Sequence, residues 1–257
     1  MNLKFDIKNI VGILSGLFLV LAFTACTDAD DIAPLSRITY FPDFILEGEP
    51  SYDIACGEQF TLPGVRVEEE GVEIDFTTEI TGRFFNVTDG GTLVNTEIPD
   101  VYSVTYSAVN ADGFPGSSAR RVNIQPCNGD LVTSIEGAYK ATVLRGGTFS
   151  EQYQDLQPIV IADLGDDVYG ISHAVGGYYD IGRGFGSGYA SYGAKVKANN
   201  IAGNDFSQVE QGVFPIWGNT VQISNFTVDA AAKTISFLGT GNFGNGEFTV
   251  NLTQIDN

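Results

Sequence analysis

Histidine and cysteine are scarce in this chain of 257 residues. There is one histidine, His173, and there are three cysteines. One imidazole cannot build a zinc site of several histidines, and we expect His173 to be structural rather than a member of a catalytic triad. With one cysteine assigned to an anchor and two to a pair, as argued below, the sequence leaves no thiol nucleophile. It predicts no catalytic residue, no metal site and no cofactor.

Positive charge is also in short supply. Lys and Arg total 13 against 32 Asp and Glu, which gives a formal net charge of −19. A chain without a basic stripe cannot displace counterions from phosphates, so nucleic acid is excluded as a partner. Adhesion to anionic lipid through charge is disfavoured for the same reason. Acidity of this kind favours solubility outside the cell.

Long apolar runs are absent except near the start, where Ile10 to Phe23 follow Lys4 and Lys8. Fourteen residues are too few to span a bilayer and suit the core of an export signal. The run ends in "FTAC", which resembles the lipobox of bacterial lipoproteins, and "TDADD" after Cys26 resembles the surface-export signal of Bacteroidota lipoproteins. The sequence therefore predicts a signal peptide over residues 1–25, a lipidated linker over 26–35, and an acyl anchor on Cys26 in the outer membrane, facing outward. A buried apolar helix with a chance cysteine is the alternative.

Glycine and β-forming residues are abundant. The chain has 31 glycines and many Thr, Val, Tyr and Phe, and it shows no convincing amphipathic helix. Its length suits two domains, so we predict an all-β protein of two modules. Cys56 and Cys127 form an even pair in an exported chain and bracket the first module, which predicts a disulfide, with two free buried thiols as the alternative.

The first module is predicted over residues 36–128 as a β-sandwich of short strands. In "VYSVTYSAV" (101–109), Tyr102, Val104, Tyr106 and Ala108 share the face expected to be core. Other candidate strands are 58–62, 65–69, 72–80 and 92–98. The segments "SRITYFP", "CGEQFTLPGVRVEEEG" and "YSVTYSAVNADGFPGSSARRVNI" resemble the bacterial surface immunoglobulin-like (Ig-like) domain, which implies a spacer or interaction module without catalysis. One departure is Asp100, where that family generally has glycine, so the turn there is expected to differ.

The second module is predicted over residues 131–257 as a small antiparallel β-barrel or curled sheet of eight or nine strands. "GDLVTSIEG" (129–137) is interpreted as a linker, and a bulge is predicted near Asn225 because the apolar alternation slips there. The segments "IEGAY", "VYGISHAVGGYYDIGRGFGSGYA" and "KTISF" resemble the C-terminal domain of uncharacterised Bacteroidota lipoproteins. Such proteins are often encoded near polysaccharide-uptake genes, and the family has no assigned catalytic residues.

The stretch "GGYYDIGRGFGSGYASYG" (176–193) combines glycines with aromatic rings. Glycine in strands marks bends or close backbone approach, so a sheet corner is one interpretation. The other is a sugar-binding surface, because flat rings with a polar tip suit half-wet ligands. Strand alternation would place Tyr178 and Asp180 on one side and Tyr179 and Ile181 on the other. The candidate ligand-binding residues are Tyr178, Tyr179, Arg183, Phe185, Tyr189, Tyr192 and Trp217.

One further acidic stretch carries carboxylates of the kind that bind calcium. "ADLGDD" carries Asp163, Asp166 and Asp167, but without the ligand spacing of a calcium loop we predict a solvated hairpin.

These observations predict a noncatalytic surface lipoprotein that binds glycan beside a polysaccharide-uptake system. The alternative is a structural or adhesive accessory that binds another outer-membrane protein.

Overall fold

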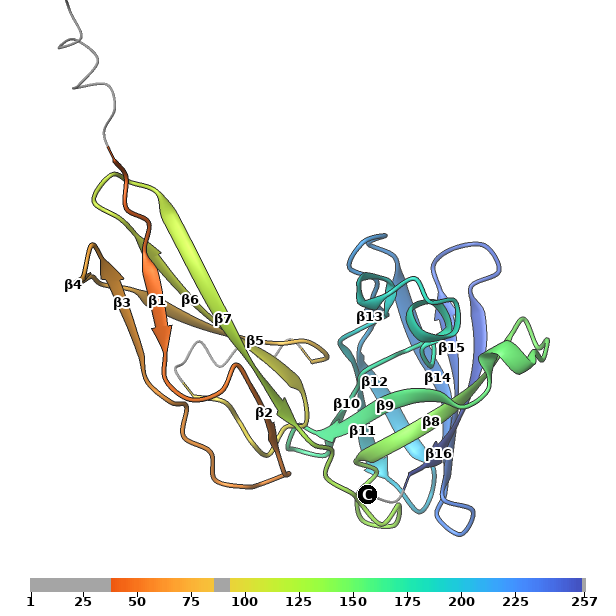
Figure 1. Cartoon of the computed structure of the whole chain (residues 1–257). Coiled ribbons are helices and arrows are strands. Elements are labelled where there is room, and N and C mark those ends of the chain that lie inside the picture. The colour runs from red at the N-terminus through yellow and green to blue at the C-terminus, as the bar shows by residue number, and fades with distance from the viewer. Residues whose placement is uncertain (1–37, 86–92, 256–257) are drawn as a thin grey trace, which may run out of the picture. The chain divides into compact units, whose positions relative to one another are not determined.

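The protein is described from a computed structural model that covers residues 38–85 and 93–255. The predicted signal peptide, the linker and Cys26 lie outside these residues. Among the described residues, those from 41 to 255 belong to one compact unit, and residues 38–40 fall in another. Within the compact unit we call residues 41–127 the Ig-like module and residues 128–255 the C-terminal module (Figure 1). No helix among the described residues is long and apolar enough to cross a membrane.

Strands of the Ig-like module lie in two sheets, as a sandwich requires. The first sheet has the order β1-β3-β4 and the second the order β2-β7-β6-β5, with β2 parallel to β7 and the other pairs antiparallel. The strands are β1 (Asp43–Leu46), β2 (Ser51–Ile54), β3 (Val65–Glu69), β4 (Val72–Glu73), β5 (Thr77–Gly82), β6 (Val101–Val109) and β7 (Pro115–Ile124). The expected strands at 58–62 and in the described part of 92–98 do not form. A turn at residues 56–57 precedes the first of these segments and a turn at residues 96–97 interrupts the second, and the remaining described residues of both lack regular structure.

Alternation in β6 produces the core of the Ig-like module, as predicted. Tyr102, Val104, Tyr106 and Ala108 are all buried, and Ile124 of β7 packs with them. Phe44 and Leu46 of the first sheet pack against this cluster, so the two sheets enclose it. Cys56 and Cys127 are joined by a disulfide with their Cα atoms 5.2 Å apart, which ties the end of β2 to the exit from β7.

The C-terminal module contains one antiparallel sheet of nine strands in the order β12-β11-β10-β9-β8-β16-β15-β14-β13. Its strands are β8 (Gly137–Arg145), β9 (Leu156–Asp163), β10 (Val168–Ile171), β11 (Ala194–Asn200), β12 (Asp205–Glu210), β13 (Gly212–Val213), β14 (Thr220–Asp229), β15 (Thr234–Gly241) and β16 (Glu247–Gln254). Short helical turns are η1 (Glu151–Tyr153), η2 (Tyr178–Gly182) and η3 (Ser187–Tyr189). The predicted bulge is confirmed: the β14–β15 register shifts between Ser224 and Thr227, and Asn225 has a positive φ.

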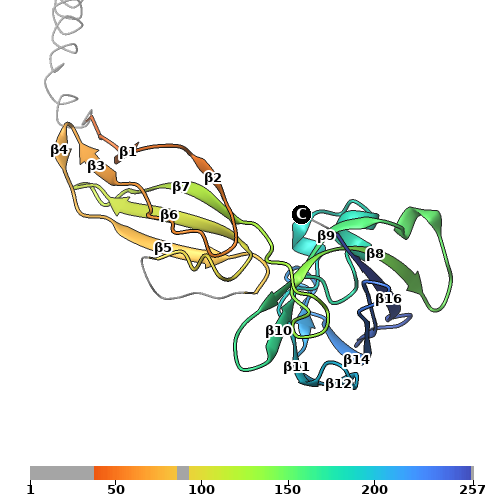
Figure 2. The same cartoon turned by 90° about the horizontal axis from the view of Figure 1, so that it is seen from below.

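The sheet curls until its edges meet, which gives the nearly closed barrel seen from below in Figure 2. Near the seam Val213 pairs with Tyr192, and the amide of Ile223 donates to the Gln208 side chain over 3.2 Å. Side chains rather than a continuous ladder therefore join β12 to β14. The interior is a single apolar core built from the inward residues of all the long strands.

The segment 129–137, interpreted from the sequence as a linker, is part of this core. Leu131 and Ile135 are buried, and the hydroxyl of Tyr139 donates to the Ile135 carbonyl over 2.6 Å. The Asp130 carboxylate accepts the backbone N–H groups of Val132, Thr133 and Ser134, which folds the segment into a tight turn. These hydrogen bonds to the charged form lower the pKa of Asp130 to about 2. The linker interpretation was wrong. The hydrogen bonds of Asp130 form a turn that directs Leu131 and Ile135 into the core.

The two modules meet through the turn that follows β5. Phe84 and Phe85 are buried against Val160 and Ala162 of β9, and the Gly193 amide donates to the Phe84 carbonyl over 3.1 Å. The Asp100 carboxylate holds this turn, since it accepts the N–H groups of residues 83, 84 and 85. Asp100 is itself buried, and burial raises its pKa in spite of these hydrogen bonds. The aspartate that departs from the Ig-like pattern thus shapes the contact with the next module.

Candidate functional site

The chain enters the barrel after β10. Residues 172–179 are all buried, and Gly176 lies between Val143 of β8 and Val250 of β16. A Cβ on Gly176 would stand 2.7 Å from Cγ2 of Val143 and 2.8 Å from Cγ1 of Val250, and its φ is +60°. Glycine is therefore required here both for space and for backbone conformation. The segment fills the end of the barrel opposite Ile135, because Tyr178 lies beside Arg145 at the far end of β8.

Tyr178 and Tyr179 lie in the π-helical turn η2, whose coil is drawn near β13 in Figure 1. Gly177 precedes the turn in a left-handed conformation with φ 76°. Both tyrosines are buried, and their rings are 4.9 Å apart. The predicted strand alternation, with these two rings on opposite sides, was wrong. Glycines at 176 and 177 let the backbone coil, and both neighbouring rings then fit into the end of the barrel.

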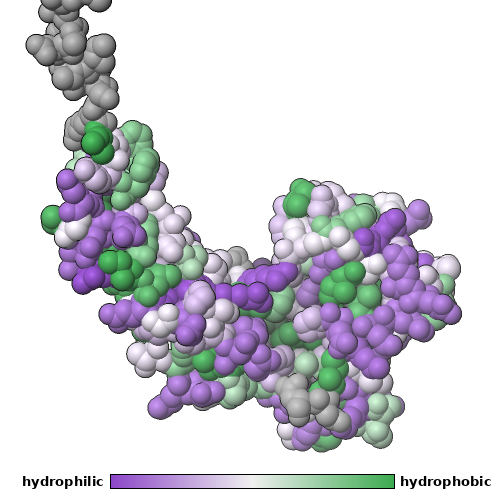
Figure 3. Space-filling view, viewed as in Figure 1, coloured by the Kyte–Doolittle hydropathy of each residue, from purple (hydrophilic) through white to green (hydrophobic). Residues whose placement is uncertain are grey.

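Four aromatic side chains form what we call the rim cluster: Tyr179, Phe185, Tyr189 and Trp217. The Trp217 ring lies 5.0 Å from Tyr179, 4.9 Å from Tyr189 and 6.5 Å from Phe185, and each pair meets edge to face. Phe185 is 46% exposed and Trp217 is 41% exposed, whereas Tyr189 is half-buried. Two large rings are therefore held in fixed orientations at the surface by two that are more buried. On the face drawn in Figure 3, green apolar areas of the C-terminal module lie among purple polar ones.

The rim cluster rests on residues that the sequence did not single out. Phe214 is buried with its ring 5.4 Å from Trp217 and 5.7 Å from Tyr179. The guanidinium of Arg145 lies 5.7 Å from the Tyr179 ring and donates from Nε to the Asn245 carbonyl over 2.9 Å. Burial raises the pKa of Tyr179, and the Arg145 charge opposes this. Strand ends far apart in the sequence supply these residues, so no local motif indicates them.

A cavity of about 290 Å³ opens beside the rim cluster, lined by Tyr179, Trp217, Asn219 and Phe243. The Asn219 side chain donates from Nδ2 to Oδ1 of Asn242 over 3.0 Å, and the same oxygen accepts the Thr220 amide. An amide pair of fixed orientation thus stands beside exposed ring surface. This combination of apolar faces and a few convergent polar groups is typical of small-ligand sites.

The two remaining candidate residues, Arg183 and Tyr192, lie in different parts of the structure. Arg183 is exposed, with its guanidinium 5.3 Å from the centre of the Phe185 ring, so it lies beside the rim cluster. Tyr192 does not join the cluster. Its ring packs on Phe84 and His173 at the contact between modules, and its hydroxyl accepts from Nε of Arg83 over 3.2 Å. Burial raises the pKa of Tyr192. It leaves the cluster because the chain turns back after η3 to begin β11.

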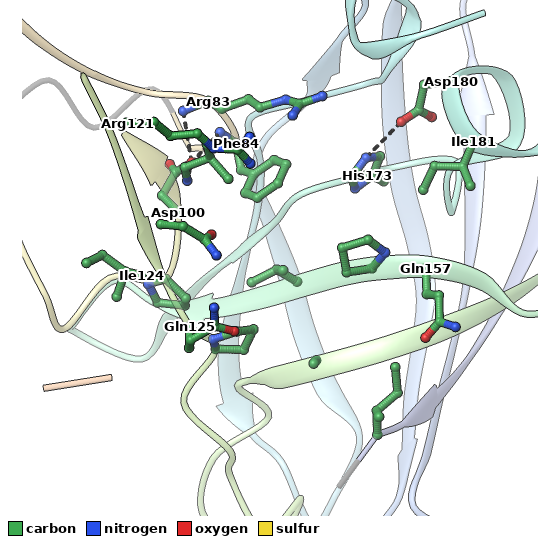
Figure 4. Close-up of a pocket in the computed structure, with 18 residues that line it drawn as sticks. Arg83, Phe84, Asp100, Arg121, Ile124, Gln125, Gln157, His173, Asp180 and Ile181 are labelled. Carbon is green, nitrogen blue, oxygen red and sulfur yellow. Dashed lines mark hydrogen bonds and ion pairs between the residues drawn. The ribbon is translucent and has the colours of Figure 1, made fainter. Parts of the chain in front are cut away.

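His173 contacts a serine and an aspartate, which was not expected from the sequence; Figure 4 shows its contact with the aspartate, Asp180. Its Nδ1 is 2.7 Å from the Ser172 hydroxyl and its Nε2 is 3.0 Å from Oδ2 of Asp180. Ser172 is completely buried, and its hydroxyl oxygen accepts the Val160 amide over 2.8 Å. A hydroxyl that no substrate can reach does not act as a nucleophile. The arrangement orients side chains.

The acidic stretch "ADLGDD" forms the turn between β9 and β10. Oδ1 of Asp163 accepts the Gly165 amide over 2.8 Å, and Asp166 and Asp167 both have positive φ. Across residues 38–85 and 93–255, no group of three or more Asp, Glu, His or Cys is placed to hold a metal ion.

Two family models match this chain, one in each module. Residues 44–124 match the family described as "Bacterial surface protein, Ig-like domain". Residues 128–254 match a family of BT2262-like C-terminal domains. The chain is thus similar to a bacterial surface Ig-like domain over residues 44–124 and to a C-terminal domain of that second family over residues 128–254. Neither is a family of enzymes.

Among solved structures, the crystal structure of the lipoprotein BT2262 from Bacteroides thetaiotaomicron is similar, with 23% identity and a TM-score of 0.47. The match covers 83% of this chain and 100% of that one. Comparison with curated proteins gives no match.

Proposed function

We propose that this protein is a lipid-anchored surface protein of Bacteroidota that binds glycan without catalysis at the rim cluster. The observation that carries the proposal is the pair of exposed rings, Phe185 and Trp217, fixed edge to face beside a cavity lined by Asn219. The C–H faces of a sugar ring pack on aromatic faces, and its hydroxyls need donors and acceptors at the edge. Arg183 and Asn219 supply such groups.

The rest of the chain supports this role. The predicted acyl anchor on Cys26 would hold the protein at the outer membrane, facing outward, and the Ig-like module would separate the binding end from the anchor. The match to the bacterial surface Ig-like family and the predicted lipoprotein signal both support a location at the cell surface. A polysaccharide or a membrane uptake complex is the expected partner.

Trp217 makes the test direct, because it is the only tryptophan in the sequence. Purified protein is titrated with a panel of soluble polysaccharides and oligosaccharides while tryptophan emission is recorded, and affinity is checked by retardation in polysaccharide gels. We expect one member of the panel to shift the emission. Phe185→Ala should then weaken binding roughly threefold to tenfold, because a ring contact of this kind contributes about 0.5–1.5 kcal/mol.

The matched control is Phe114→Ala. Phe114 is 47% exposed, nearly the same fraction as Phe185 at 46%, but it lies in the Ig-like module. Equal loss of binding in both variants, or no glycan that shifts the emission or retards migration, would contradict the proposal.

A second candidate is an accessory that binds another outer-membrane protein. Ile216 is 59% exposed next to Trp217 and extends the apolar surface beyond what a sugar needs. This candidate is favoured if the protein captures a defined membrane protein, if Ile216→Ser abolishes that capture, and if no glycan of the panel binds.

A further inference from the structure

A second cavity lies at the contact between the two modules and is separate from the rim cluster. Its volume is about 440 Å³, within the range of small-molecule sites. Arg83 and Gln125 of the Ig-like module line it together with Gln157, His173, Asp180 and Ile181 of the C-terminal module (Figure 4). We call it the junction cavity.

The walls of this cavity are held by contacts already described. The turn at residues 83–85 is fixed by the Asp100 carboxylate on one side and by Val160 and Ala162 on the other. His173 is fixed by Ser172, and its Nε2 meets Oδ2 of Asp180. The turn at residues 83–85 and the His173–Asp180 pair therefore have defined positions before any ligand arrives.

The Asp180 carboxylate is buried, and one of its two oxygens has a hydrogen-bond partner among the described residues. Its side chain is only 6% exposed, and Oδ2 is taken by His173. Within the part of the chain that the structure describes, nothing donates to its other oxygen, Oδ1. Buried carboxylate oxygens are nearly always paired, and Asp180 lines the junction cavity, so its unpaired oxygen points to a donor that the described chain does not supply. This oxygen exposes almost no surface, so a donor in the cavity reaches it through a small displacement of the Asp180 side chain.

We propose that the junction cavity binds one uncharged sugar residue, with a hydroxyl that donates to Oδ1 of Asp180. Arg83 extends toward Asp180 in Figure 4 and lines the same cavity, so its guanidinium disfavours a cationic ligand. The Asp180 carboxylate likewise disfavours an anion. A neutral polyol satisfies both, because each hydroxyl donates and accepts, and Gln125 and Gln157 add further partners. Ile181 and Val160 offer apolar surface to the C–H faces of the ring.

The choice of a sugar rests on the proposed function, since it assigns a second position for the same class of ligand. The residues are different, however, so the two sites can fail separately. Trp217→Ala removes one of the two exposed rings of the rim cluster and leaves the residues of the junction cavity unchanged.

The experiment is calorimetric titration of the purified protein with a panel of neutral mono- and disaccharides, each raised to about 10 mM, with amino acids and small amines as further probes. Asp180→Asn keeps the size of the side chain and removes its charge. Gln157→Phe fills the cavity from an exposed position, and Gln154→Phe is the matched control, because Gln154 is exposed nearby and does not line the cavity. Thermal melting checks that each variant folds.

We expect a saccharide to bind the parent and Trp217→Ala alike, with affinity reduced about tenfold or more in Asp180→Asn and Gln157→Phe but not in Gln154→Phe. If Asp180→Asn fails to fold, Gln157→Phe decides. Binding that persists in Gln157→Phe would overturn the proposal. So would binding of amines or amino acids alone, or the absence of any saccharide binding by the parent. A saccharide whose binding is lost in Trp217→Ala and kept in Gln157→Phe would support the rim cluster and refute the junction site.

Discussion

The two modules show opposite ways of using short antiparallel strands. The Ig-like module divides its strands between two sheets around a modest core and adds a disulfide between Cys56 and Cys127. The C-terminal module curls one sheet around a larger core and fills its end with its own chain at residues 172–179. The comparison indicates that a disulfide stabilises the first module, whereas side-chain packing stabilises the second. That packing also concentrates aromatic side chains at one end of the barrel.

The largest expected effect comes from breaking the covalent tie. The disulfide closes a loop with a sequence separation of 71 residues, so on the chain-entropy model Cys56→Ser with Cys127→Ser should lower the free energy of unfolding by about 4 kcal/mol. The loss should fall on the Ig-like module alone. Calorimetry should show its transition move down while that of the C-terminal module stays. Equal shifts in both transitions would mean that the modules unfold as one body.

Asp100→Ala sharpens the comparison at the contact between modules. The change leaves the buried N–H groups of Phe84 and Phe85 without an acceptor, at roughly 3 kcal/mol in total. Because Phe84 and Phe85 pack on β9, we expect a weaker coupling between the two unfolding transitions as well as lower stability. The control is Asp75→Ala at an exposed position. A variant as stable as that control would show that the carboxylate does not hold the turn.

Gly176→Ala probes the packing of the C-terminal module. The new methyl group would meet Val143 and Val250, so we expect a loss of about 2–3 kcal/mol from overpacking and backbone strain together. Gly184→Ala is a matched control, since Gly184 has a similar φ of +67° but open space around its Cβ position. Urea unfolding should rank the two. If both variants lose the same stability, backbone strain alone matters and the close approach inside the barrel does not.

The smallest effect concerns the turn at Asp130 and its dependence on pH. Its pKa in the folded protein, about 2, is below the ordinary 3.8, so the carboxylate contributes stability above pH 3.8 that disappears as the pH falls through 2. Asp130→Ala should therefore melt at a lower temperature than the parent at pH 5, and the gap should narrow toward pH 2. A gap that stays constant with pH would show that the charge plays no part.

The Ig-like core was predicted correctly from strand periodicity, because every second side chain of β6 from Tyr102 to Ala108 is buried. The same rule failed at Tyr178 and Tyr179. Glycines there permit backbone conformations outside the strand region, and a barrel end buries neighbouring residues together. The polar composition of 129–137 concealed Leu131 and Ile135 for a related reason, since Asp130 satisfies the turn and frees them to point inward.

Part of the candidate site could be predicted from composition. Tyr179, Phe185, Tyr189 and Trp217 do come together, although Trp217 arrives from a distant loop. Phe214 and Arg145 could not be found, because curling of the sheet alone brings them beneath the rings. The junction cavity was also out of reach, since its residues belong to two modules and only their contact creates it.

The chain that enters the barrel has a consequence for how recognition can change. Ala174, Val175 and Tyr178 are part of the apolar core and fill the end of the barrel. On the proposed function, the side chains that select a ligand therefore lie outside this core. Exchanging rings or amides at those outer positions is expected to change which ligand binds without changing the fold.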